Sequence, residues 1–308
     1  MKSIFMGTPY FGKEILKKLH TDFSIHTVVC QPDKPVGRKK EIIYSEVKNY
    51  ALEENLRILQ PEKIKNNVSF LNELKAINPD FIFVAAYGKI LTKDILNIPK
   101  FGCINVHSSL LPKYRGAAPI NWALINGDKE TGVTIMEMDE GMDTGNIILS
   151  KKVSIEEGDN VLSLTEKLAT IGCDAIGEFF KKFLETGCIN SKPQDNSLAS
   201  VAPKIDKEIS KIDWNKNSFD ILNLIRGSNP WPGATTTLFK SKVTIWEAQE
   251  AGPVLAKPGS IKKIDKKMFV SCKDKEIEII KIQRSGKNTM DGKSFINGIS
   301  VREKALFN

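Results

Sequence analysis

The sequence has no long hydrophobic run and few cysteines, and both shortages narrow the classes of protein to which it can belong. None of its apolar runs reaches the ~18–20 residues that a membrane helix needs, although 41% of its 308 residues are hydrophobic. The first residues enter a strand and a turn without the apolar region of a signal peptide or the Arg- and Ser-rich pattern of a transit peptide. We therefore expect a cytoplasmic protein that makes no contact with a membrane.

The five cysteines are widely spread and form no CxxC pair, so the sequence predicts no zinc site and no other metal centre. In a reducing compartment they stay thiols. Only Cys103 lies near the residues discussed below, and the small apolar character of a thiol favours a buried position for it.

Two common catalytic motifs are missing as well. The turn GTPYFG after the first strand is not GxGxxG, and Cys30 and Gln31 stand where a dinucleotide-binding protein has an acidic residue. A nicotinamide cofactor is therefore not predicted. Ser108 and Ser109 have no GxSxG elbow around them, which argues against a serine hydrolase.

Positive charge is unevenly distributed along the chain. Residues 204–308 contain 20 lysines and arginines against 12 aspartates and glutamates, whereas residues 1–203 contain 25 of each kind. A basic domain attached to a neutral one indicates a polyanion held beside an active site. A solubilising lysine surface would give the same count.

Strands and helices alternate over residues 1–189, which we interpret as one domain. Expected strands are 3–7, 26–31, 80–88 and 102–108, and expected helices are 13–19, 44–56, 68–79 and 162–187. The alternation predicts an α/β fold with a Rossmann-like, doubly wound sheet. Ligands of such a sheet bind at the carboxyl ends of its strands.

A polar stretch with Pro193, Pro203 and several Ser and Asn residues follows, and we interpret residues 190–206 as a linker. Residues 207–308 then begin with a helix and continue as five short β-prone runs separated by Gly, Lys and Asp. Many short strands in about 100 residues are typical of a small barrel. We predict an OB-like β-barrel domain, a fold that often binds oligonucleotides.

Asn105, His107 and Asp143 form the candidate catalytic group. Asn105 and His107 are two apart in a strand, so their side chains point to the same face. Asp143 closes the loop DEGMDTG further along the chain. Taken singly, each residue also has a purely structural interpretation. Asn105 could be a turn or strand-end residue, His107 a core residue and Asp143 a turn residue.

Together the three side chains are suited to acyl transfer without a protein nucleophile. An amide and an imidazolium N–H can stabilise an oxyanion, and a carboxylate can orient the imidazole and accept a proton. An α-amino group has a pKa of about 8, so part of it is already nucleophilic near neutrality.

Several segments in combination resemble the formyltetrahydrofolate-dependent formyltransferases. They are MGTPYFG, QPDKPVGRKK, VAAYGKIL, NVHSSLLPKYRGAAPINWALINGD, ETGVTIMEMDEGMDTGN and NPWPGA. The resemblance spans nearly the full chain. Within the family, it is most detailed with the members that act on methionyl-tRNA. It implies transfer of a formyl group from 10-formyltetrahydrofolate to the α-amino group of methionyl-initiator tRNA, by a monomer without a metal.

The resemblance also implies roles for particular residues. The folate is expected to contact Tyr87, Gly88, Ser108, Ser109, Leu110, Leu111 and Pro112. The methionyl end and the acceptor stem of the tRNA are expected to contact Gly7, Phe11, Arg38, Lys39, Lys40 and Arg115. The loop GRKKEII departs from the family, which often has one more small or basic residue there, so its register on tRNA stays open.

Three alternatives remain. A formyltransferase for a small amine, such as a sugar nucleotide or a glycinamide nucleotide, would leave the basic C-terminal third unexplained. A formyl-folate hydrolase would release formate with no amine present. A folate- or RNA-binding protein without catalysis would have no need for the SLLPKYRG loop between the three polar residues.

Overall fold

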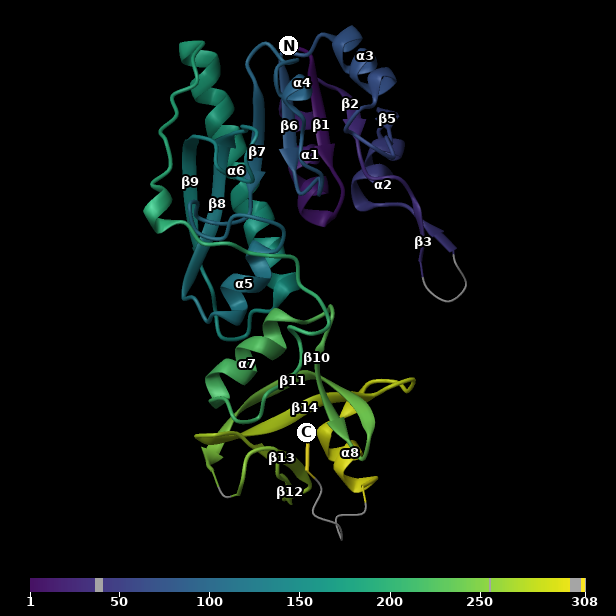
Figure 1. Ribbon diagram of the computed structural model, residues 1–308, viewed down its shortest axis with the longest axis vertical. Coiled ribbons are helices and arrows are strands. Elements are labelled where there is room, and N and C mark those ends of the chain that lie inside the picture. The colour runs from purple at the N-terminus through teal and green to yellow at the C-terminus, as the bar shows by residue number, and fades with distance from the viewer. Residues whose placement is uncertain (37–40, 255, 300–305, 308) are drawn as a thin grey trace. The chain divides into compact units, whose positions relative to one another are not determined.

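A computed structural model describes residues 1–36, 41–254, 256–299 and 306–307, and the chain divides into two compact units (Figure 1). The first unit comprises Met1–Pro119, Glu130–Ser154 and Thr165–Ala202, and the second comprises Ile120–Lys129, Ile155–Leu164 and Pro203–Asn308. Two short stretches from the first 189 residues therefore belong to the second unit.

A seven-stranded sheet of order β5–β2–β1–β6–β7–β8–β9 organises the first unit. The strands from β5 to β7 are parallel, whereas β8 runs antiparallel to both of its neighbours. The strands are β1 (Ser3–Gly7), β2 (Ile25–Val29), β5 (Arg57–Leu59), β6 (Phe81–Ala85), β7 (Cys103–His107), β8 (Glu130–Glu137) and β9 (Ile147–Ser154). The predicted Rossmann-like, doubly wound sheet is confirmed, and the antiparallel pair of strands β8 and β9 extends it.

Helices and a short hairpin connect these strands. They are α1 (Tyr10–Asp22), the hairpin β3 (Lys34–Val36) and β4 (Glu41–Ile43), α2 (Glu46–Glu53), α3 (Val68–Ile77), α4 (Lys93–Leu96), α5 (Pro119–Ile125), α6 (Val161–Thr186) and the 3₁₀ turn η1 (Asn196–Leu198). Side-chain oxygens of Ser45 and Asn67 accept a backbone N–H at the starts of α2 and α3, as helix caps do. In the described part of the chain, no helix is long and apolar enough to cross a membrane.

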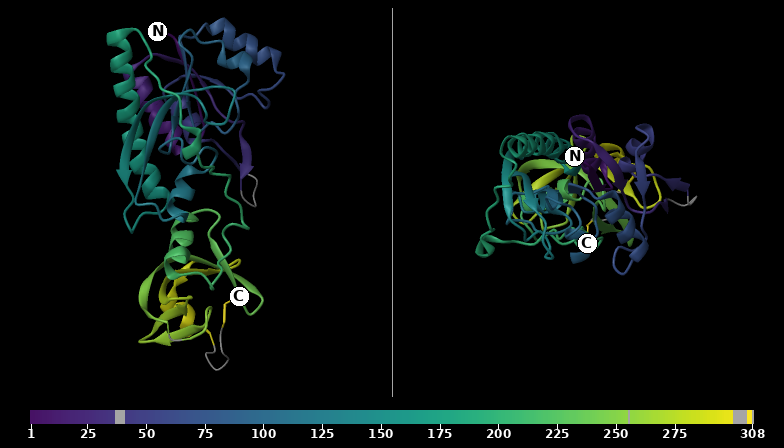
Figure 2. Two further views of the ribbon diagram at one scale, coloured as in Figure 1. Left: turned by 60° about the vertical axis from the view of Figure 1, so that its left-hand side comes forward. Right: turned by 90° about the horizontal axis from the view of Figure 1, so that it is seen from above.

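Both faces of the parallel sheet are covered, which explains why its strands are apolar at consecutive positions. Ile82 and Val84 of β6 pack with residues of α3 and α4. Phe81 and Phe83 of the same strand face the other way and contact Phe180 of α6. Figure 2 shows α6 beside α1 on that face, and there Cys173 Sγ lies 3.5 Å from the carbonyl oxygen of Glu14.

Strands β8 and β9 are not among the strands expected from the sequence. β9 is half-exposed along its length and alternates polar and apolar residues only weakly, as an edge strand does. β8 is buried but lies between two loops rich in Gly, Asp and Glu, which obscure its bounds in the sequence.

An antiparallel sheet of order β10–β11–β14–β13–β12 forms the second unit, with β15 paired to β14. The elements are α7 (Ser218–Gly227), β10 (Ala234–Leu238), β11 (Ser241–Pro253), β12 (Ile261–Ile264), β13 (Lys267–Ser271), β14 (Lys275–Arg284), β15 (Met290–Asp291) and α8 (Gly292–Asn297). Register shifts interrupt the long β11–β14 ladder, and such bulges bend strands. Side chains of α7, α8 and the sheet share one apolar core. This small barrel-like domain is the fold expected from the sequence.

The aromatic cluster beneath α6 gives a test of the core. Replacing Phe180, which is fully buried, with Ala is expected to lower the free energy of unfolding by about 3–5 kcal/mol, because the cavity cannot fully collapse. Urea unfolding followed by circular dichroism measures it. Leu184→Ala on the same helix is the matched control, since Leu184 is 63% exposed. Equal losses in the two variants would contradict the packing described.

Candidate active site

A cavity of about 420 Å³ opens in the first unit beyond the carboxyl ends of β6 and β7. The sheet order reverses between β1 and β6, and ligands of open α/β sheets bind at such a switch point. The volume is typical of small-molecule sites. The walls are mainly apolar and include Phe11, Val84, Leu91, Met136 and Met138.

Strand β7 presents two of the three predicted catalytic side chains to this cavity. Asn105 and His107 both line it and are 7% and 6% exposed, respectively. Their spacing of two residues on an extended strand puts them on one face, as the sequence indicates. Asp143 also lines the cavity, from the loop between β8 and β9.

The carboxylate of Asp143 is the point on which the polar groups converge. Asn105 Nδ2 lies 3.4 Å from Oδ1, and His107 Nδ1 lies 3.7 Å from the same oxygen. The backbone N–H of Gly116 donates to Oδ2 at 2.8 Å. The end of β7, the loop 112–118 and the loop between β8 and β9 therefore meet at one side chain.

The other ring nitrogen of His107 fixes how the imidazole can act. Nε2 lies 3.0 Å from the carbonyl oxygen of Tyr114, and because a carbonyl only accepts, Nε2 carries the proton. Nδ1 is therefore the nitrogen that faces Asp143. A proton on Nδ1 would make the ring cationic and attractive to the carboxylate.

Three residues around this site have backbone conformations that L-residues rarely adopt. Ala86, Tyr114 and Asp143 have φ of +50°, +61° and +55°, and such strain often accompanies functional sites. Gly116 has φ of +121°, and a Cβ there would lie 2.8 Å from the carbonyl oxygen of Ala202. The loop 112–118 thus needs glycine at this position.

The cavity brings together many of the residues singled out from the sequence. Phe11, Tyr87, Gly88, Asn105, His107, Ser108 and Asp143 line it. Burial raises the pKa of the Tyr87 phenol, whose hydroxyl has no hydrogen-bond partner among the described residues. Lys89, which is not among the predicted site residues, lines the cavity too, and burial lowers the pKa of its ammonium group.

Other predicted residues shape the loops and do not line the cavity. The hydroxyl of Ser109 is fully buried and donates to the carbonyl oxygen of Lys113 at 2.7 Å. A Cβ on Gly7 would lie 2.8 Å from the carbonyl oxygen of Ala85, so this glycine permits a close approach of β1 and β6. Leu110, Leu111 and Pro112 belong to the same loop as Ser109, and Leu111 is buried.

Arg115 is engaged within the first unit. Its guanidinium donates to Gln194 Oε1 from Nε at 3.1 Å and from Nη2 at 2.7 Å, and to Asn196 Oδ1 at 2.8 Å. A contact with substrate remains a prediction for this residue. Arg38, Lys39 and Lys40 lie outside the described residues.

Residues 191–202, which we call the strap, fall within the expected linker, yet they are hydrogen-bonded to the site. Ser200 accepts the backbone N–H of Tyr114 through Oγ at 2.9 Å. The N–H of Arg115 donates to the carbonyl oxygen of Ser200, and the N–H of Ala202 donates to that of Arg115. No sequence signal marks this role, because Ser and Asn residues near prolines are typical of loops in general.

Two further observations concern metals and thiols. Within the described ranges, no group of three or more His, Cys, Asp or Glu residues could hold a metal ion. Cys103 is 3% exposed, and burial raises the pKa of its thiol to about 12. Its predicted position in the core is confirmed.

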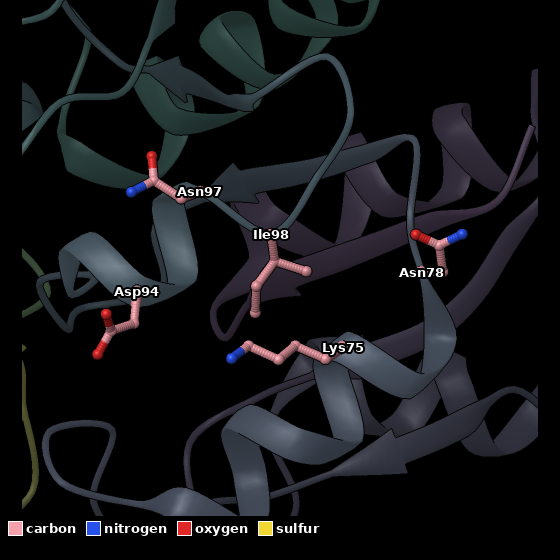
Figure 3. A pocket seen from close by; sticks show the side chains of 5 residues that line it. All are labelled: Lys75, Asn78, Asp94, Asn97 and Ile98. Atoms are coloured by element: carbon pink, nitrogen blue, oxygen red, sulfur yellow. The ribbon is translucent and has the colours of Figure 1, made fainter.

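A surface hollow elsewhere on the first unit has no comparable chemistry. It is lined by Lys75, Asn78, Asp94, Asn97 and Ile98, from α3, α4 and the turns after them. Figure 3 shows their polar ends lying apart from one another without a common point. The cavity at β6 and β7 is therefore the candidate active site.

Comparison with known proteins gives a match over both halves of the chain. The family described as Formyl transferase matches residues 1–178, and the family described as Formyl transferase, C-terminal domain, matches residues 204–300. A methionyl-tRNA formyltransferase of Caldanaerobacter subterraneus is 45% identical over 99% of both chains. Another, of Thermodesulfovibrio yellowstonii, is 47% identical over 97% of this chain and 96% of its own.

Solved structures of low sequence identity share the fold. An N-formyltransferase from Helicobacter canadensis, in complex with folinic acid and dTDP-3-aminofucose, has a TM-score of 0.68 at 20% identity and covers 92% of this chain and 99% of its own. A sugar 3N-formyl transferase in the presence of dTDP and 5-N-formyl-THF has a TM-score of 0.66 at 22% identity, with 94% and 99% covered.

The site loop is tested by comparing two glycines with positive φ. A Cβ on Gly102 (φ +91°) would meet no atom within 4 Å, whereas a Cβ on Gly116 would meet Ala202. Gly102→Ala is expected to cost only the backbone penalty, about 1–2 kcal/mol, and Gly116→Ala clearly more, because the strap must move as well. Urea denaturation measures the loss in the free energy of unfolding for both variants. Equal losses would show that the strap can move away from residue 116 at no cost, contrary to the contact described.

Proposed function

Because the chain belongs to the formyl transferase family, we propose that it transfers a formyl group from 10-formyltetrahydrofolate to the α-amino group of methionyl-initiator tRNA. The product, N-formylmethionyl-tRNA, serves translation initiation. Relatives that are 42–47% identical over nearly the whole chain are methionyl-tRNA formyltransferases. The observation that carries the chemistry is the convergence of Asn105, His107 and Asp143 on one wall of the cavity.

The reaction forms a bond from the methionyl nitrogen to the formyl carbon and breaks the bond from that carbon to the donor nitrogen. As the carbon becomes tetrahedral, its oxygen gains negative charge. Asn105 Nδ2 and a protonated His107 Nδ1 are the side-chain donors that stabilise this charge. Preorganised donors of this kind are strongest where water is excluded, as at these buried side chains.

Asp143 completes the proton balance. Its carboxylate lies 3.7 Å from His107 Nδ1 and takes up the proton that the attacking amine loses. One proton is then delivered to the departing nitrogen of the folate, so that the amine loses one proton and the folate gains one. No covalent bond to the protein is required, because an α-amino group is itself a sufficient nucleophile near neutrality.

The cavity suits a folate as the formyl donor. Its apolar walls would hold the flat ring system, and the hydroxyl of Tyr87, unpartnered in the described part of the chain, is a polar group still to be satisfied at the wall. Gly88, Ser108 and the backbone near them are the candidate polar contacts. Ser109 supports this wall from inside the loop.

The second unit supplies positive charge for tRNA. Basic residues exceed acidic residues by eight in residues 204–308, and phosphate neutralisation by such residues makes RNA binding salt-sensitive. Phe11, at the cavity wall, and Gly7, behind it, would border the methionyl end, with Arg38, Lys39 and Lys40 nearer the acceptor stem. We assign the enzyme to the cytoplasm as a monomer.

One assay separates this function from the alternatives. Formylation of charged initiator and elongator methionyl-tRNA is measured with 10-formyltetrahydrofolate, beside an aminosugar nucleotide, a glycinamide nucleotide and no acceptor. Initiator methionyl-tRNA is expected to be the preferred acceptor. Faster formylation of a small amine, or formate release at the same rate without an acceptor, would overturn the proposal.

The catalytic assignment is tested by removing single groups. Asn105→Ala is expected to lower kcat roughly 100–1000-fold, because it removes a donor aimed at the developing oxyanion. Asp143→Ala is expected to lower it by a similar factor, because it removes the group that takes up the proton of the amine. Single-turnover formylation gives kcat, and circular dichroism checks the fold. Asn97→Ala, at the surface hollow of Figure 3, is the matched control. Full turnover in either active-site variant would refute its role.

The tRNA assignment is better tested by substitution than by truncation. Removing residues 204–308 would strip Asn121 of its bond to the carbonyl oxygen of Gly227, at 2.9 Å, and would deprive the carbonyl oxygen of Glu156 of the N–H that Arg226 donates to it. Residues 120–129 and 155–164 belong to the same unit as the deleted part. Truncation would therefore disturb more than tRNA binding.

Lys240 lies in the β10–β11 turn and Lys242 follows it in β11. Both are exposed and make no ion pair within the described residues. Replacing both with Gln is expected to raise KM for tRNA severalfold and to lower its salt dependence by about two in log–log slope, with KM for the folate unchanged. Lys65→Gln with Lys181→Gln, both exposed on the first unit, is the control. Equal effects of the two pairs of substitutions on KM for tRNA would argue against tRNA binding by the second unit.

A further inference from the structure

The side chain of Gln194 joins the two loops that form the wall around Asp143. Its Nε2 donates to the carbonyl oxygens of Asp143 at 2.9 Å and Gly145 at 2.7 Å. Its Oε1 accepts two N–H groups from Arg115. All hydrogen-bonding atoms of this carboxamide are thus used, with donors and acceptors in matching places.

These bonds act on the residue whose position matters most. Asp143 has φ of +55°, a left-handed conformation, so its side-chain direction depends on what holds its backbone. Gln194 holds the Asp143 carbonyl from one side, while the N–H of Gly116 holds the carboxylate from the other. Arg115, the residue before Gly116, is held by the same Gln194 side chain.

We propose that Gln194 is a positioning residue for the transfer reaction, which keeps the Asp143 carboxylate within reach of Asn105 and His107. The inference rests on the function proposed above. Gln194 does not line the cavity and has no contact with the reacting atoms. It acts through the backbone of residues 143–145 and through Arg115, and so sets the distance between two loops.

The alternative is that Gln194 only fastens the strap to the first unit. The strap has many other fastenings that do not involve this side chain. Ser191 Oγ donates to a carboxylate oxygen of Glu137, and Lys192 pairs with Ile147 in a β-bridge. Ser200 and Ala202 bond to the backbone of loop 112–118. The strap therefore stays in place when the Gln194 carboxamide is removed.

Two substitutions separate the role of the accepting oxygen of the Gln194 carboxamide from that of its donating nitrogen. Gln194→Ala removes both atoms. Gln194→Glu keeps an acceptor for Arg115 but turns a carboxylate oxygen toward the carbonyl oxygens of Asp143 and Gly145, which repels them. Both variants are expected to lower kcat for methionyl-tRNA formylation by about 10–100-fold, the scale of a misplacement of about 1 Å, with KM for both substrates within about twofold.

Asn196→Ala is the matched control, because it removes a strap contact to Arg115 and leaves residues 143–145 untouched. Its kcat is expected to stay within about twofold of the parent enzyme. A normal kcat in Gln194→Glu beside a slow Gln194→Ala would show that only the bond to Arg115 matters, and would overturn the proposal.

A double-variant cycle tests whether Gln194 works through Asp143. If it does, Gln194→Ala adds little to Asp143→Ala, and the double variant is slower than Asp143→Ala by no more than about twofold. Full multiplication of the two losses would mean that Gln194 acts independently of Asp143, contrary to the proposal.

Hydrogen exchange of the substrate-free protein gives a readout that does not depend on activity. The Gly116 amide, bonded to Asp143, is expected to exchange about tenfold faster in both Gln194 variants than in Asn196→Ala. Unchanged protection of Gly116 would overturn the positioning role whatever the kinetics. If the parent enzyme failed to formylate methionyl-tRNA, the proposed function would fall, and exchange alone would decide the role of Gln194.

Discussion

The candidate site depends on one carboxylate, which joins the loop between β8 and β9 to the end of β7 and to the loop 112–118. Asp143 contacts the end of β7 through Asn105 and His107, and the loop 112–118 through the N–H of Gly116. A partly buried carboxylate such as that of Asp143, which is 16% exposed, is costly unless donors surround it. The donors on β7 are the same groups to which we assign the chemistry, so the packing of the loops and the assembly of the proposed catalytic group depend on the same contacts.

Much of the fold could be predicted because its determinants are local. Consecutive apolar residues in β1, β6 and β7 indicate parallel strands buried on both faces. The two-residue spacing of Asn105 and His107 is enough to place both on one face, because side chains alternate along a strand. The position of the site followed from the rule for strand ends.

What could not be predicted depends on contacts between distant residues. Gln194 lies 51 residues from Asp143 and 79 from Arg115, and no local pattern marks the pairing. The bond from His107 Nε2 to the carbonyl oxygen of Tyr114 selects which ring nitrogen faces Asp143, and a backbone acceptor leaves no trace in side-chain identity. The edge strand β9 (IILSKKVS) has no buried residue and carries three polar residues in a row, so its sequence has neither an apolar run nor a strict alternation.

Because the strap comes late in the chain, the candidate site can be completed only late in synthesis. The Rossmann-like strands β1 to β7 are complete at residue 107, and that part can collapse while the ribosome is still working. The wall around Asp143 has to wait for Gln194, Ser200 and Ala202 to emerge. A nascent chain arrested shortly before residue 194 would hold every side chain to which we assign catalysis and yet lack a finished site.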